Sequence, residues 1–252
     1  MLPPSEPRET TLNGINLIDT FGNGTRQSAY LQMQELEVKS HDALFVIMSD
    51  VLLDKPHVME KLNTVFQGFE MSNTFPLFIL MGSFTSKPYL SEGAREFILG
   101  LFQSLANCIC SYPMLAQKAK LLIVPGPEDP GVASISPRRQ IPSYFTKELQ
   151  RKVPNMSFAS NPCKLRFYTQ EIVLFREDLL KKIQRHIILN PASNNNDPSQ
   201  DVDITQLLAQ SILDQAHLCP LPLESCPIYW DLGYFFSFFL TYLLSFFHSF
   251  IF

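Results

Sequence analysis

The sequence predicts an α/β fold built on a parallel sheet, and three short apolar runs are the main reason. They are "ALFVIM" at 43–48, "PLFILM" at 76–81 and "KLLIV" at 120–124, and each ends at a turn-forming or small polar residue. Continuous apolar runs of this length are typical of strands buried on both faces of a sheet. Helical patterns separate the three runs, so the order strand, helix, strand, helix, strand predicts right-handed βαβ units.

The composition allows one large domain or two small ones and excludes a surface built to bind nucleic acid directly. Of the 252 residues, 46% are hydrophobic and 17% are charged, so the chain can bury a substantial core. A net charge of -4 and a pI near 5.7 exclude a phosphate-neutralising surface, because that takes clustered Lys and Arg. The five cysteines form no C-x-x-C pair, and the N-terminus has no secretory pattern. We therefore expect free thiols in a cytosolic or nuclear protein that reaches DNA only through a partner.

The first element in chain order is a loop-rich lead-in over residues 1–41. Six prolines and glycines lie between Pro3 and Gly24, and the apolar runs there are short. Such a composition indicates loops, with at most one strand near "INLI" at 15–18.

Two amphipathic helices are expected between the three strands. In residues 55–70 and 91–113 apolar side chains recur at intervals of three and four, which is the spacing of one helix face. Pro56 suits the first turn of the former helix, and Ser91 is a candidate cap for the latter. Pro113 is expected to end the second helix.

The second half of the chain predicts a mixture of short elements. Its patterns indicate a helix at 141–154, a strand at 156–160, a hairpin that turns around Thr169 and Gln170, and helices at 178–189 and 203–216. Residues 190–201 form a low-complexity loop, and residues 217–230 contain too many prolines for a helix.

Chemistry is to be sought in the loops that follow the three strands. In an open α/β sheet, ligands bind outside the carboxyl ends of the strands. The loops read "SDVLLD", "GSFTS" and "GPEDPG". This set resembles the calcineurin-like metallophosphoesterases, whose strands end in D-x-H, G-D and G-N-H-[DE] and supply ligands to two metal ions. The resemblance implies a βαβ layered sandwich of that family, incomplete at the C-terminus.

Motif by motif, the resemblance keeps the glycines and loses the metal ligands. Asp50 matches the Asp of D-x-H, but the His position holds Leu52, and Ser83 replaces the bridging Asp. Pro127 and Glu128 stand where the family has Asn and His. The resemblance therefore implies a degenerate site without metal, cofactor or catalytic residue. Its positions are Asp50, Leu52, Ser83, Pro127, Glu128, Asp129 and His217, of which Asp129 matches a residue that is not usually a ligand and His217 lies near the fourth motif.

Purely structural interpretations of the same residues stay open. Carboxylates in such loops commonly cap helices or accept hydrogen bonds from loop amides, and His217 fits a packed, hydrogen-bonded histidine. The rigid "PGPEDPG" loop fits either an interaction surface or a simple structural turn. An active metallophosphoesterase with unorthodox ligands is the enzymatic alternative.

Five segments in order resemble the B-subunit family of the replicative DNA polymerases. They are "MSDVLLDKPHVMEKL", "LMGSFTS", "LIVPGPEDPG", "SNPCKLRFYTQEIVLFREDL" and "LPLESCPIYW". The resemblance implies a non-enzymatic nuclear scaffold for DNA replication that binds the zinc-bearing C-terminal module of the polymerase's catalytic subunit. Family members carry an OB-fold, which would precede residue 1. The chain is thus expected to be a fragment or a variant isoform, with the OB-fold's exit at 1–41 and a truncated phosphoesterase-like domain at 42–230.

The segment 231–252 is expected to be an aberrant apolar tail. Residues 234–252 contain no Asp, Glu, Lys or Arg, and about 20 apolar residues suffice to span a bilayer. Its Phe, Ser, Leu and Tyr residues are also those that pyrimidine-rich codons encode, which favours translated intron or an alternative 3' end. A tail anchor, which would make the chain a membrane-anchored adaptor, is the alternative.

Overall fold

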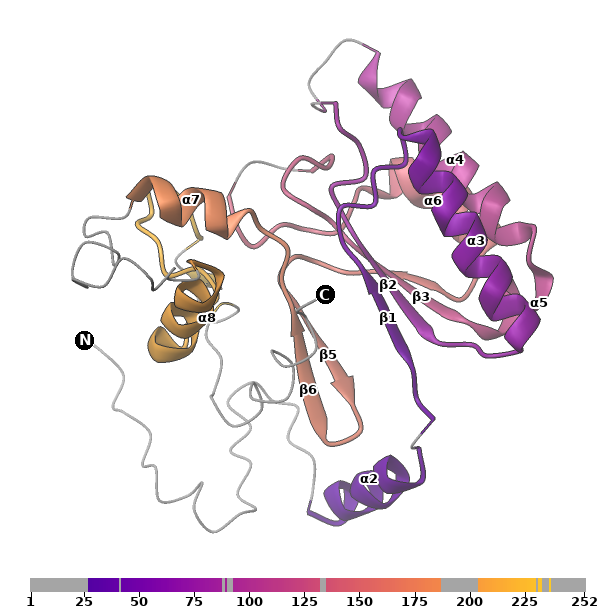
Figure 1. The fold of residues 1–252 in the computed structure, drawn as a ribbon, viewed down its shortest axis with the longest axis horizontal. Helices are drawn as coiled ribbons and strands as arrows, with labels where there is room; N and C mark the ends of the chain where they lie inside the picture. The colour runs from indigo at the N-terminus through magenta and orange to yellow at the C-terminus, as the bar shows by residue number, and fades with distance from the viewer. Residues whose placement is uncertain are drawn as a thin grey trace, which may run out of the picture. The chain divides into compact units, whose positions relative to one another are not determined.

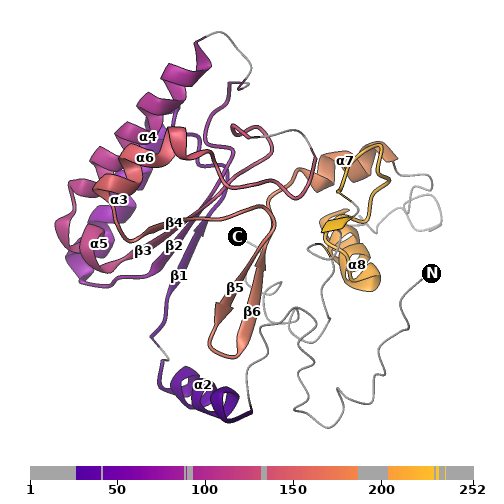
Figure 2. The ribbon, with the colours of Figure 1, turned by 180° about the vertical axis from the view of Figure 1, so that it is seen from behind.

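The chain has an α/β architecture around a four-stranded parallel sheet (Figures 1 and 2). The computed structural model describes residues 27–40, 42–87, 89, 93–131, 135–186, 204–229, 231, 232 and 236. Two compact units are distinguished within it, one of residues 44–165 and 173–252 and one of residues 1–43 and 166–172.

The sheet contains the three strands predicted for it and, as a fourth, the strand predicted at 156–160. Its order is β1 (Phe45–Met48), β2 (Leu77–Met81), β3 (Lys120–Val124) and β4 (Met156–Phe158), and all three pairings are parallel. The continuous apolar sequence of β2 and β3 fits their position inside the sheet, because both of their faces are covered. The prediction of a parallel α/β sheet is confirmed.

Helices gather on one side of this sheet in both views (Figures 1 and 2). They are α3 (Pro56–Ser72), α4 (Ala94–Cys110), α5 (Pro113–Lys118) and α6 (Ser143–Lys152). Pro56 begins α3 as predicted. α4 ends at Cys110, shortly before Pro113, as predicted. Pro113 also begins α5, which was not predicted, since the fixed φ and missing N–H of proline suit a first helical position. Ser91, the predicted cap of α4, lies outside the described residues.

One hydrophobic core joins the strands to these helices. Its fully buried members include Phe66 of α3, Phe78 and Leu80 of β2, and Phe102 and Leu105 of α4. The ring of Phe78 meets the rings of Phe66 and Phe69 edge-on, each at 5.3 Å between centroids. The second β-strand is thereby fixed to α3, and its carboxyl end is held in place below the loops that follow.

The remaining elements are a hairpin and two helices. β5 (Cys163–Phe167) pairs with β6 (Gln170–Leu174), and α7 (Leu179–His186) and α8 (Ile204–Gln215) follow. The hairpin turns at Tyr168 and Thr169, one residue earlier than predicted, with Tyr168 in the left-handed region at φ 50°. A smaller core contains Leu179, Leu218, Cys219, Cys226 and Phe236. All five cysteines are free.

One helix corrects part of the predicted loop-rich lead-in over residues 1–41, of which residues 1–26 lie outside the described residues. Residues Gln27–Lys39 form the helix α2, because this stretch lacks Gly and Pro and is rich in good helix formers. Within the smaller unit the Glu37 carboxylate accepts hydrogen bonds from the backbone and hydroxyl of Thr169. The Ser40 hydroxyl lies 3.0 Å from that of Tyr168.

Several predictions fall on residues that are not described. They are the strand near 15–18, the loop at 190–201 and most of the apolar tail. Within the described part of the chain, no helix is long and apolar enough to cross a membrane. Phe236, inside the predicted tail, is buried, and its carbonyl accepts a hydrogen bond from the Leu218 amide at 2.8 Å.

Truncation of Phe78 tests the anchoring of β2. We expect Phe78→Ala to lower the free energy of unfolding by about 3–5 kcal/mol, because a fully buried phenyl ring leaves a cavity. The measurement is urea unfolding followed by circular dichroism. Met71→Ala is the control, since Met71 is 76% exposed and its loss should change stability by less than about 0.5 kcal/mol. Equal effects of the two changes would contradict this packing.

Candidate functional site

The loops after β2 and β3 meet backbone to backbone. A Cβ atom added at Gly126 would lie 2.5 Å from the carbonyl carbon of Gly82 and from the nitrogen of Ser83. One added at Gly82 would lie 2.6 Å from the nitrogen of Gly126. Only glycine fits at either position, because real Cβ atoms do not approach other heavy atoms so closely. The two loops therefore form a packed junction at the carboxyl end of the sheet.

Asp129 closes this junction. Its carboxylate accepts hydrogen bonds from the amide of Phe84 in the β2 loop and from the amide of Gly126 in its own loop, both at 2.7 Å. Burial of the carboxylate raises the pKa of Asp129 to about 6, against the two amides and the charges of Arg138 and Arg176, which lower it. The Asp129 side chain thus accepts hydrogen bonds from loop amides, which is the structural role that the sequence left open for the loop acids.

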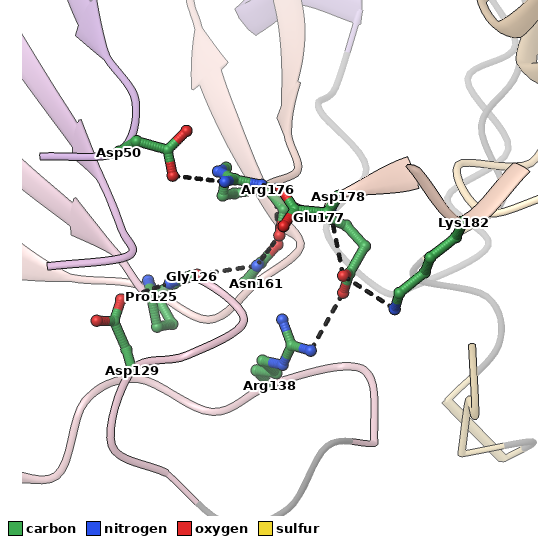
Figure 3. Close-up of polar contacts among 10 residues, drawn as sticks. All are labelled: Asp50, Pro125, Gly126, Asp129, Arg138, Asn161, Arg176, Glu177, Asp178 and Lys182. Atoms are coloured by element: carbon green, nitrogen blue, oxygen red, sulfur yellow. Dashed lines mark hydrogen bonds and ion pairs between the residues drawn. The ribbon is translucent and has the colours of Figure 1, made fainter. Parts of the chain in front are cut away.

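Asp50, at the end of β1, forms an ion pair with an arginine from the end of β6. Its Oδ1 lies 2.5 Å from Nη2 of Arg176, and Nη1 of the same guanidinium lies 2.8 Å from Asp178 (Figure 3). Burial opposes the charged form of Arg176, but Asp50 and Asp178 outweigh it and raise its pKa. A guanidinium therefore compensates the carboxylate that the resemblance places at the first metal-ligand position.

Asn161 connects the end of β3 to the end of β6. It is 1% exposed, and its Nδ2 donates to the carbonyls of Pro125 at 2.8 Å and Arg176 at 2.7 Å. Its Oδ1 accepts from the Arg176 amide at 3.1 Å. Two of these three hydrogen bonds hold the backbone of Arg176 and the third connects it to Pro125, so the guanidinium starts from a defined position beside Asp50 (Figure 3).

A second ion-pair group lies beside the first. The side chain of Glu177 is 1% exposed, and it lies 3.1 Å from Arg138 and 3.0 Å from Lys182 (Figure 3). Burial of a carboxylate is costly unless cations compensate it, and here two do. Each acid of the network thus has a partner. Asp50 and Asp178 pair with Arg176, Glu177 pairs with Arg138 and Lys182, and Asp129 accepts hydrogen bonds from loop amides.

The side chains of the other predicted site positions make none of the contacts described above. The Leu52 amide donates to the Asp50 carbonyl at 2.8 Å, Ser83 is 7% exposed, and Glu128 is exposed. Pro127 lies in the turn between Gly126 and Asp129.

His217 belongs to the smaller core. Its Nδ1 lies 2.9 Å from the carbonyl oxygen and 3.1 Å from the amide nitrogen of Cys219, and its ring stacks on Phe236 at 5.8 Å. Across the described ranges, no group of three or more His, Cys, Asp or Glu residues is placed to hold a metal ion.

Sequence reasoning missed the residues that organise the site. Arg176, Glu177, Asp178 and Asn161 are not among the positions that the sequence predicts for the site. Asn161 follows β4, whose carboxyl end lies at the same edge of the parallel sheet as the three loops, and this position is the signal that could have found it. Arg176, Glu177 and Asp178 follow β6, which belongs to a separate two-stranded sheet, so the strand order gives no such signal for them.

Comparison with known proteins identifies the family of the chain. The model of a protein family, the B subunits of DNA polymerases alpha and epsilon, matches residues 45–241, which include the whole network described above. The chain belongs to this family.

Relatives from plants and animals give the same result. The chain is 42% identical over 233 residues to the B subunit of DNA polymerase epsilon from Arabidopsis thaliana, with 91% of this chain and 43% of that protein covered. It is 39% identical to "DNA polymerase epsilon subunit 2" of Mus musculus and of Homo sapiens over 234 residues, 92% of this chain and 43% of each relative. The chain thus spans less than half the length of these relatives.

Substitution of Gly126 tests the backbone junction. Gly126→Ala should lower the free energy of unfolding by roughly 3 kcal/mol or more, because the new methyl group meets backbone atoms that cannot move aside. Gly131→Ala is the matched control, since a Cβ there meets nothing within 4 Å. Urea unfolding of both variants measures the difference. Similar midpoints for the two variants would show that the loops do not approach as described.

Asp129 should make stability depend on pH in an unusual direction. A carboxyl whose pKa is raised on folding, here from 3.8 to about 6, stabilises the folded chain while protonated, and this stabilisation is lost as pH rises through about 6. We therefore expect the unfolding free energy of the parent, measured relative to that of Asp129→Asn, to fall by on the order of 1 kcal/mol between about pH 5 and pH 7. Urea unfolding across this range provides the measurement. A difference that stays constant or grows would contradict the raised pKa.

Proposed function

We propose that this chain is the phosphoesterase-like part of a non-catalytic accessory subunit of the DNA polymerase epsilon complex. The observation that carries the proposal is the family match over residues 45–241 together with relatives named as epsilon subunits. The chain would act in the nucleus in DNA replication. Its net charge of -4 supports contact with DNA through a partner and not through a basic surface of its own.

The partner in this proposal is the polymerase's catalytic subunit, through its zinc-bearing C-terminal module. The site supports a scaffold role because its loops are fixed by internal contacts. Asp129 holds the β2 and β3 loops, and Asn161 and Arg176 connect the ends of β1, β3 and β6. A surface that is already rigid loses little conformational entropy when a partner binds.

We infer further that the fold is a degenerate calcineurin-like phosphoesterase and that the substituted positions Leu52, Ser83, Pro127 and Glu128 belong to its former metal site. Two metal ions need several oxygen and nitrogen ligands with free lone pairs to activate a bridging water. The carboxylates that remain are engaged, Asp50 by Arg176 and Asp129 by two amides. The alternative of an active phosphoesterase would require these contacts to break.

Binding to the catalytic subunit's C-terminal module tests the proposal. We expect the immobilised, zinc-loaded module to retain the purified chain, and the module stripped of zinc by a chelator to release it, because small zinc modules fold only with their metal. Failure of the zinc-loaded module to retain the chain, in an assay where a full-length relative binds its own module, would overturn the proposal.

A hydrolysis assay addresses the enzymatic alternative. With p-nitrophenyl phosphate and added Mn²⁺, we expect a rate no higher than that of buffer with Mn²⁺ alone. A rate that rises with Mn²⁺ and falls in Asp50→Asn would support the phosphoesterase instead.

A further inference from the structure

A groove runs beside the edge strand β4, away from the candidate site. Its volume is about 300 Å³, at the lower end of the range of ligand-binding pockets. It is lined by Gln140 and Ile141, by Ser143, Thr146 and Gln150 of α6, and by Met156 to Phe158 of β4. All of these elements belong to the larger unit.

The geometry of the neighbouring strands explains why the groove exists. Arg138 and Asn161 form an antiparallel bridge, with backbone hydrogen bonds of 2.7 and 2.8 Å in the two directions. A few residues later the chain turns away to begin α6 at Ser143, so it does not continue along β4. β4 itself is the edge strand of the sheet and pairs only with β3 among the described strands.

The backbone of β4 presents hydrogen-bonding groups to this groove. Asn155 and Ala159 bond to β3, so the residues between them that alternate in the ladder, Met156 and Phe158, turn their backbone groups to the outer side. The Met156 amide donates to the Val153 carbonyl at 3.3 Å. The Met156 carbonyl and both backbone groups of Phe158 have no partner within the part of the chain that the structure describes. These groups are those that an added strand would use.

The polar lining indicates the chemistry of the occupant. Gln140, Ser143, Thr146, Gln150 and Ser157 are all uncharged, and each carries an amide or hydroxyl group. Amides and hydroxyls both donate and accept hydrogen bonds, so they suit an uncharged polypeptide backbone better than a phosphate or an acidic peptide. A single-stranded nucleic acid would leave its phosphates without cations here.

We propose that the groove beside β4 receives an extended, uncharged segment of the catalytic subunit, which adds a strand to the sheet. This inference rests on the proposed function and names the surface through which the partner binds. Backbone hydrogen bonds to Met156 and Phe158 give the segment its extended form, and Gln140 and Gln150 contact its exposed side.

Filling the groove tests this directly. Gln150→Trp places a large ring in the groove and should weaken binding of the zinc-loaded C-terminal module at least about tenfold, as expected when a central contact is blocked. Gln67→Trp is the matched control, because Gln67 is an exposed glutamine on α3 outside the groove. The affinity of this variant for the module should stay within about twofold of that of the parent. Isothermal titration calorimetry gives both values. Equal affinities for the two variants would overturn the inference.

A second pair of variants isolates the backbone contact. Phe158→Pro removes the outward N–H without touching the ladder to β3, whereas Phe158→Ala keeps that N–H and removes the same partly buried ring. We expect Phe158→Pro to bind more weakly than Phe158→Ala.

Hydrogen–deuterium exchange of the parent chain gives the independent readout. The amide of Phe158 should exchange rapidly in the free chain and become protected in the complex. Protection already present in the free chain, or none gained in the complex, would overturn the groove inference. If the parent binds the module, but the variants do not change the affinity and the Phe158 amide gains no protection, the proposed function stands and this inference fails. Absence of binding by the parent overturns both.

Discussion

The close approach of Gly82 and Gly126 is the constraint on which the carboxyl end of the sheet depends. The two backbones leave no room for a side chain, and the carboxylate of Asp129 bonds to the β2 loop and to its own loop at once. Neighbouring parallel strands fix where each loop starts, and the junction then fixes the direction that each takes. Because backbone and one protein carboxylate fill this space, the loop ends form a packed joint.

The charge network extends this joint to segments that are distant in the sequence. Asp50 pairs with Arg176 across 126 residues, and Asn161 bonds to both Pro125 and Arg176. Glu177, almost fully buried, takes Arg138 and Lys182 as counterions. Removing one member of such a buried pair costs about 3–5 kcal/mol, because the other charge stays buried without compensation. The network therefore disfavours any arrangement that leaves one of the buried charges, such as Glu177, without its counterions.

How much could be predicted from the sequence depended on the range of the interactions involved. β1, β2 and β3 were predicted within two residues because burial on both faces demands an apolar run, which is a local property. α2 was missed because the loop prediction, which rested on the prolines and glycines up to Gly24, was extended to residues 27–39, which contain neither. α5 was missed because Pro113 was expected only to end a helix, although proline can also begin one. The roles of Arg176 and Asn161 depend on contacts with Asp50 and Pro125 that no local pattern encodes. The loop positions were found through a resemblance, but their contacts required the fold.

The same carboxylates can serve a metal ion or the protein itself, and the choice follows from what else surrounds them. A metal-binding carboxylate keeps lone pairs directed into an open site, whereas Asp129 directs its oxygens at the amides of Phe84 and Gly126. A guanidinium beside Asp50 supplies the positive charge locally and permanently, since arginine does not lose its proton at any physiological pH. The loops then keep their shape without any bound ion. A joint of this kind keeps a constant shape, and a surface of constant shape loses little conformational entropy on binding, which supports the proposed scaffold role.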